Sequence, residues 1–187
     1  MFITLEKSRE LIEKYLKDEK NRIHSRESEV VLKSLAKHFG EDEEKWAIAG
    51  LLHDLDWENT LDNFKQHGIQ TIELVEKEGL ALPDDVAHAI SAHNESYTGI
   101  KRESKLDYAL AASESITGLI YSYALMRPEK LKGMKASSLN KKFKDKSFAA
   151  NVSRELIADI EKIGIEKSKF FEIAIKAMQS IASEIDL

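Results

Sequence analysis

Apolar residues recur at helical spacing along almost the whole of this chain, and no other feature of the sequence constrains its fold as strongly. Alternating strand patterns are absent, and so are the Asn-Gly and Asp-Gly pairs that favour tight hairpin turns. The sequence therefore predicts an all-α fold. With 187 residues the chain has the usual size of one domain, so we expect residues 1–187 to form a single domain.

Caps and breakers divide this pattern into separate helices. The second predicted helix follows the turn around His24 and stops at Gly40. Residues 128–187 form a C-terminal helical subregion in this interpretation, and its basic stretch LKGMKASSLNKKFKDKSF favours a lid or a docking segment. Other helices are predicted over 4–18, 41–52, 61–78, 83–93, 103–126, 151–163 and 167–185.

The composition excludes several kinds of site. There is no cysteine, which rules out disulfides, thiolate zinc sites and cysteine nucleophiles, so imidazole and carboxylate groups must hold any metal. A net charge of -5 disfavours nucleic-acid duplexes as partners and leaves small phosphate ligands open. No apolar run is long enough to span a bilayer, and the start MFITLEKSRE lacks a signal-peptide pattern. We therefore expect a cytoplasmic protein that does not enter the membrane.

The segment EDEEKWAIAGLLHDLDW is the best candidate for a buried central helix. Its acids favour a helix N-terminus, and the residues from Trp46 to Leu52 are almost all apolar. His53 and Asp54 follow directly. Burying two such polar groups is costly unless something binds them, and a loosened last helical turn would let both reach one ion. A lone His-Asp pair is nevertheless common by chance.

Further histidines stand beside polar residues or glycine in otherwise apolar surroundings, namely His24, His67 and His93. Imidazole is the commonest metal ligand in proteins. His88 faces away from His93 on a helix, because five positions correspond to about 500°, so we interpret it as structural or exposed. His38 lies in the last turn before Gly40, where the helix dipole favours a cation.

Two acids on the predicted 103–126 helix, Asp107 and Glu114, share one face. Either could supply a carboxylate ligand from a distant part of the chain. Isolated acids more often border the solvent, but Glu114 lies within the mostly apolar run ALAASESITGLIYSYAL.

These motifs, in this order, resemble the HD-domain metal-dependent phosphohydrolase superfamily, over about residues 20–185. That family has a leading His, a later His-Asp pair and a distant Asp on another helix, and here HSRESEVV, LLHD and the downstream acids match. The segment from KQHG to AHNE looks like the part of HDIG and HD-GYP proteins that carries two additional histidines. The motifs ALAASESITGLI, RP and KKFKDKSF are similar to those of small uncharacterised bacterial and archaeal HD proteins.

The chain departs from the family pattern at three places. Leu55 and Asp56 replace the Ile-Gly after the pair, which alters a turn more than a ligand. Asn94 replaces a second His and the GYP triplet is missing, so cyclic di-GMP hydrolysis is unsupported. Glu114 stands where the family has its distant Asp, so either Glu114 reaches the metal, Asp107 substitutes, or metal binding is weakened.

The resemblance implies an HD-domain helical bundle with a metal site between its central helices, and hydrolysis of a nucleotide or other small phosphate ester. One divalent ion would be held by His24, His53, Asp54 and Glu114, and a second, if present, by Asp54, His67 and His93. Asp54, His67 and His93 are the expected catalytic residues. Nitrogen and oxygen ligands suit Mn, Fe, Ni, Co or Zn, and Mg less well. The partner is a small phosphorylated substrate, and a homodimer stays open.

Three alternatives compete with a hydrolase. A degenerate HD protein would bind a nucleotide as a sensor without cleaving it, for which the Glu114 replacement is the motive. A helical interaction module would use the histidines only to fill its core. A di-iron oxygenase would resemble a few members of the family.

Overall fold

The computed structural model describes all 187 residues, and it is built from helices alone, which confirms the predicted all-α fold. The only strand-like feature is an isolated bridge between Phe2 and Ala81. The α-helices are α1 (Leu5–Tyr15), α2 (Glu19–Phe39), α3 (Glu43–Leu52), α4 (Trp57–Thr60), α5 (Ile69–Lys77), α6 (Asp84–His93), α7 (Glu95–Thr98), α8 (Lys105–Leu125), α9 (Ala136–Lys144), α10 (Arg154–Ala158) and α11 (Lys167–Ser180), with two 3-10 helices, η1 (Phe64–Gln66) and η2 (Asp159–Ile163).

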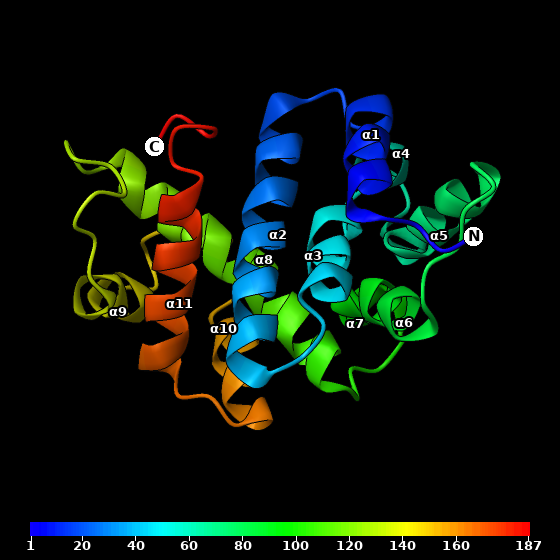
Figure 1. The fold of residues 1–187 in the computed structure, drawn as a ribbon. Helices are drawn as coiled ribbons and strands as arrows, with labels where there is room; N and C mark the ends of the chain where they lie inside the picture. Colours follow the sequence, from blue (N-terminus) through cyan, green and yellow to red (C-terminus); the bar gives the residue numbers. More distant parts are fainter.

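Two helices of 21 residues each, α2 and α8, form the centre of the molecule. In Figure 1, α2 stands in the middle and α8 crosses behind it, with α3 beside α2. The side chain of Asp18 caps the start of α2, and Gly40 ends it in the left-handed conformation. Ser104 and Asp107 start α8 with a reciprocal capping box. Both long helices thus have strong local start signals.

The remaining helices cover the central pair on two sides. Helices α5, α6 and α7 lie on the side of the N-terminus, and α9 and α11 on the side of the C-terminus (Figure 1). Helix α6 packs against both α3 and α8, whereas α11 packs against α2 and α9. One continuous cluster of 41 buried apolar residues, from Ile3 to Ile185, connects these layers. None of the helices combines the length and the apolar character that a bilayer crossing requires.

Helices α2 and α3 approach each other so closely that a side chain does not fit at Gly50. A Cβ built there would lie 2.6 Å from the carbonyl oxygen of Ser28, which is backbone and cannot move aside. This contact fixes the end of α3, and hence His53, against the middle of α2.

The continuous helix predicted over 61–78 is wrong. The structure has only η1 and α5 in that region, separated by a turn, and α4 ends before it. The break occurs at Gly68, whose φ of 86° suits glycine and whose absent Cβ leaves room for the carbonyl oxygen of Ile90. Apolar spacing alone does not reveal a tertiary contact of this kind.

Other boundaries also shift. Helix α2 begins at Glu19, before His24, so His24 lies within the helix rather than at the turn before it. The predicted 151–163 helix is α10 followed by the 3-10 helix η2, and the last helix ends at Ser180. The basic stretch after Pro128 contains α9, which packs against α8 and α11.

Candidate metal centre

His53 and Asp54 occupy the exit of α3, as the apolar segment before them predicts. His53 caps the C-terminus of the helix, and the chain turns immediately afterwards. This turn lets adjacent side chains converge, so that Nε2 of His53 lies 3.3 Å from Oδ1 of Asp54. His53 is 1% exposed, which places the pair at the base of a cleft rather than on the surface.

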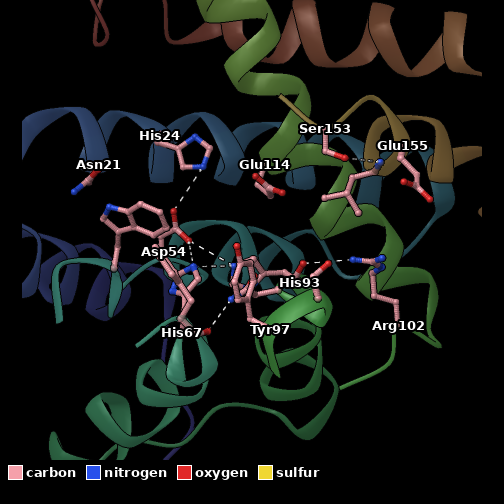
Figure 2. Close-up of a pocket in the computed structure, with 15 residues that line it drawn as sticks. Asn21, His24, Asp54, His67, His93, Tyr97, Arg102, Glu114, Ser153 and Glu155 are labelled. Carbon is pink, nitrogen blue, oxygen red and sulfur yellow. Dashed lines mark hydrogen bonds and ion pairs between the residues drawn. The ribbon is translucent and has the colours of Figure 1, made fainter. Parts of the chain in front are cut away.

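His24 reaches the same point from α2. Its Nε2 lies 3.3 Å from Nε2 of His53 and 3.8 Å from Oδ2 of Asp54. Three side chains from two helices therefore direct their ligand atoms at one position, and Figure 2 shows His24 facing Asp54 across the cleft.

His67 and His93 approach Asp54 from the opposite side. The Nε2 atoms lie 3.1 Å and 3.6 Å from Oδ1 of Asp54, and 3.2 Å from each other. His93 is the last residue of α6, and His67 follows η1 directly. Both are buried.

The ligand atoms form two groups that share Asp54. His24, His53 and Asp54 make the first group, and Asp54, His67 and His93 make the second group. Within each group all the ligand atoms lie within 4.8 Å of one another. The structure thus brings together five of the six residues that the sequence predicts as metal ligands.

Each imidazole is oriented through its other nitrogen. Nδ1 of His53 donates to the carbonyl oxygen of Gly50 at 2.8 Å, and Nδ1 of His93 donates to the carbonyl oxygen of Ile90. The hydroxyl of Thr117 donates to the carbonyl oxygen of Glu114, so it accepts from Nδ1 of His24 at 3.3 Å. Nδ1 of His67 donates to Asp56 at 2.8 Å. Fixed in this way, each ring directs its Nε2 atom at the centre, where the neutral form of the ring would offer a lone pair.

This arrangement fits a divalent cation. Lone pairs of Nε2 atoms face each other at 3.3 Å between His24 and His53 and at 3.2 Å between His67 and His93, with a carboxylate between them. Acceptors at such distances repel one another unless a proton or a cation lies between them. Imidazole and carboxylate donors suit borderline transition metals, and these residues are positioned to hold one or more of them.

The two groups differ in how readily they take up a proton. Burial lowers the pKa of His53 to about 3, so its ring is neutral and ready for a metal. Burial also lowers the pKa of His67, but hydrogen bonds to Asp54 and Asp56 outweigh this and raise it to about 10. Burial disfavours ionisation of Asp54, yet its contacts with the neighbouring histidines hold the pKa of Asp54 well below the usual range.

Asp56 contacts a candidate ligand, and the sequence interpretation missed it. It is fully buried, and it accepts from Nδ1 of His67 and from the backbone N–H groups of Gly68 and Thr71, at 2.7 Å and 3.1 Å. The departure from Ile-Gly therefore orients a ligand as well as altering a turn. An acid between Leu55 and Trp57 in a largely apolar run was the available signal.

The two candidates for the distant carboxylate lie in different places. Glu114 lines the cleft beside the ligands, and its Oε1 accepts from Ser115 at 2.9 Å. It belongs to neither group of mutually close ligand atoms, so its coordination of a metal stays a prediction. Asp107 caps the start of α8 and contacts His88 at 3.1 Å, and it does not line the cleft. Glu114 is therefore the candidate that the geometry favours.

A cleft of about 700 Å³ opens above the ligands. On one side lie Trp57, Phe64 and Tyr97, whose rings contact each other with centroids 5.8 Å and 5.4 Å apart. On the other side Arg102 enters the cleft and its N–H donates to the carbonyl oxygen of His93, as Figure 2 shows. The full lining is Asn21, His24, Asp54, Trp57, Phe64, His67, His93, Asn94, Ser96, Tyr97, Arg102, Glu114, Ser153, Glu155 and Leu156.

Comparison with known proteins agrees with this geometry. The HD domain model matches residues 21–145, a range that contains every ligand in both groups. No curated protein matches the chain. No solved structure matches it either. Because the matched range covers well over half of the sequence and includes the converging histidines and Asp54, the chain belongs to the HD domain family.

Proposed function

We propose that this protein is a metal-dependent phosphohydrolase that acts on a nucleotide or another small phosphate ester. HD domains bind divalent metals and are generally hydrolases. The observation that carries the proposal is the convergence of four imidazole Nε2 atoms on Asp54 at the base of a cleft. The cleft is large enough for a small ligand.

The ligand set defines what each residue contributes. His24, His53 and Asp54 would hold one ion, with Glu114 beside them, and Asp54, His67 and His93 would hold a second. A divalent ion bound there would acidify a water molecule and polarise a phosphoryl oxygen. The protein therefore needs no nucleophile of its own, and Asp54, which belongs to both groups, fixes their relative position.

Arg102 is the basic residue best placed to bind a substrate phosphate. It lines the cleft, its side chain is 13% exposed, and its Nε has no partner in the protein, while its Nη2 lies 3.3 Å from Oε2 of Glu95. Lys65 and Lys101 do not line the cleft, and Lys101 pairs with Glu95 on the surface. A planar guanidinium matches the oxygens of a phosphate. We infer that the phosphate lies between the metal ligands and Arg102.

The test is a metal-dependent activity screen. Purified protein without a histidine tag is stripped of metal, reloaded with Mn, Co, Ni or Zn, and assayed on nucleotides and simple phosphate esters. We expect turnover that requires metal and is lost in Asp54→Asn. Nucleotide binding without turnover for any metal would instead favour a sensor, and O2-dependent turnover with iron would favour an oxygenase. The absence of any bound ion would favour an interaction module.

A further inference from the structure

Glu27 is a buried acid that the proposed metal chemistry does not use. It lies on α2, one turn after His24, and it is only 2% exposed. Its Oε1 has no hydrogen-bond partner in the protein. Burial raises the pKa of Glu27 well above its ordinary value. A buried carboxyl group without a donor destabilises a fold, so its presence calls for a partner from outside the chain.

This carboxyl group lies in a pocket between the two central helices. The pocket has a volume of about 240 Å³, and Ile23, Tyr121 and Val152 supply its less polar walls. A planar heterocyclic ring fits a space of this size and kind, because an aromatic side chain such as Tyr121 offers a stacking surface to any base.

The pocket lies beside the metal centre. It shares His24, Gly118 and Val152 with a neighbouring cavity of about 340 Å³. That cavity in turn shares His24, Glu114 and other residues with the cleft above the metal ligands. Val152 packs closely on Gly118 where the two cavities meet, because a Cβ at Gly118 would lie 3.3 Å from Cγ2 of Val152. His24 lines both the cleft and the pocket at Glu27, so a substrate bound at the metal lies next to this pocket.

Charge decides which part of a substrate extends in this direction. Glu114 and Glu27 both lie along this branch, and Lys20 is the only lysine or arginine that lines it. Arg102 lies on the other side of the cleft, where a phosphate is favoured. The organic part of the substrate must then point towards Glu27. A carboxyl oxygen there accepts a hydrogen bond, so the complementary group on the substrate is an N–H donor.

We propose that the pocket at Glu27 binds the base of a nucleotide and that the Glu27 carboxyl group accepts a hydrogen bond from the exocyclic amine of that base. The inference rests on the proposed hydrolysis of phosphate esters and specifies its substrate class as nucleotides with an amino-bearing base. An amine donates to either form of the carboxyl group, whereas a base that carries hydrogen in place of the amine offers Glu27 no donor.

The experiment compares bases that differ only in the amine. Dissociation constants and kcat/KM with Mn are measured for GMP against IMP and for AMP against purine riboside monophosphate, in the natural protein, Glu27→Met and Glu27→Gln. Met has no strong acceptor, whereas Gln retains one. We expect the natural protein to favour the amino member of one pair by about 10-fold. The ratio should fall to about 1 in Glu27→Met and stay intermediate in Glu27→Gln. Glu172→Gln, an exposed acid on α11, is the control.

Stability separates a binding role from a structural one. Removing an unpartnered buried carboxyl group should leave the melting temperature of Glu27→Met unchanged or raise it. A large drop would mean that Glu27 supports the fold, and it would overturn the proposal. So would an amino preference that is absent from the natural protein or persists in Glu27→Met.

Two further measurements keep this proposal apart from the proposed function. Hydrolysis of p-nitrophenyl phosphate needs no base, so it should persist in Glu27→Met if the protein is a phosphohydrolase. Gly118→Val crowds Val152, which lines the pocket at Glu27, and should weaken binding of amino nucleotides while sparing hydrolysis of p-nitrophenyl phosphate. If no ester is hydrolysed but nucleotide binding still depends on Glu27, the base site stands and the hydrolase proposal fails. If esters are hydrolysed and neither Glu27→Met nor Gly118→Val changes the base selectivity, the hydrolase proposal stands and the base site fails.

Discussion

The two ligand groups share Asp54 and are built from the same residue types, yet their outer partners differ. In the first group, neutral acceptors hold the rings, namely the carbonyl oxygen of Gly50 for His53 and the hydroxyl of Thr117 for His24. In the second group, the carboxylate of Asp56 holds His67. Among the groups that orient the rings, only the second group therefore has a carboxylate.

This difference means that a proton competes with the metal mainly in the second group. With a pKa of about 3, His53 has no proton to displace at neutral pH. With a pKa of about 10, His67 keeps a proton between Asp54 and Asp56 until a cation takes its place. An outer carboxylate makes an imidazole a better ligand and a better base at once.

Replacing Asp54, which the two groups share, should lower metal affinity more than any other substitution considered. Asp54→Asn should lower metal affinity in both groups by well over about 100-fold, because even outer partners are worth about 10 to 100-fold. Elemental analysis after dialysis should find no stoichiometric ion. Asp84→Asn, at an exposed position of α6, should retain all metal. Retention of one ion in Asp54→Asn would show that the groups are independent.

Proton competition predicts different pH dependences for the two groups. Affinity of the second group should rise by up to about tenfold per pH unit between about pH 6.5 and pH 10, since one proton leaves His67. The first group should stay nearly flat there. In metal-free protein the raised pKa of His67 stabilises the fold fully below about pH 6.5, and this contribution is lost as the pH rises through about 10. Calorimetric metal titrations check the affinities, and melting curves of the metal-free protein check the stability. An equal pH dependence of metal affinity in the two groups would contradict the proposed difference between them.

The role of Asp56 gives an intermediate effect. Asp56→Asn should weaken metal binding in the second group by about 10 to 100-fold at pH 9 and leave the first group unchanged. At pH 7 the loss should be smaller, because the remaining proton on His67 is easier to displace. Asp62→Asn, an exposed acid in the same segment, controls for the charge change. A similar loss in both groups would mean that Asp56 acts by holding the fold.

Thr117 should give the smallest effect. Thr117→Val removes the acceptor for Nδ1 of His24 while keeping the shape of the side chain. Metal affinity of the first group should fall by about 10-fold, at the lower end of outer-partner effects. The second group should bind as before in the same titration. If affinity does not change, another group orients His24.

The sequence was most informative where local chemistry decides the structure. Gly40 predicted the end of α2, and apolar spacing predicted α3 and α8, although the start of α2 was placed too late. The prediction was wrong over 61–78, because the break at Gly68 depends on the carbonyl oxygen of Ile90, more than twenty residues away. The spacing of apolar residues near Gly68 cannot reveal its contact with Ile90.

A similar division applies to the candidate site. The order of motifs placed His24, the His53-Asp54 pair, His67 and His93 in one centre, and the structure agrees. Glu27 and Arg102 are not among the predicted site residues, because an acid within a charged helix and an arginine after a lysine look solvated in the sequence. Only packing shows that one is buried and that the other lines the cleft.

Gly50 joins two requirements that proteins usually keep on separate residues. Its missing side chain lets α3 lie against α2, and its carbonyl oxygen sets the ring of His53. A substitution at this position therefore cannot affect one requirement alone, since even a methyl group would disturb both the packing of α3 on α2 and the orientation of the His53 ring. Mutational tolerance should collapse at residue 50 even while the apolar neighbours Ala49 and Leu51 accept conservative exchanges, which would make Gly50 the least replaceable residue outside the ligands themselves.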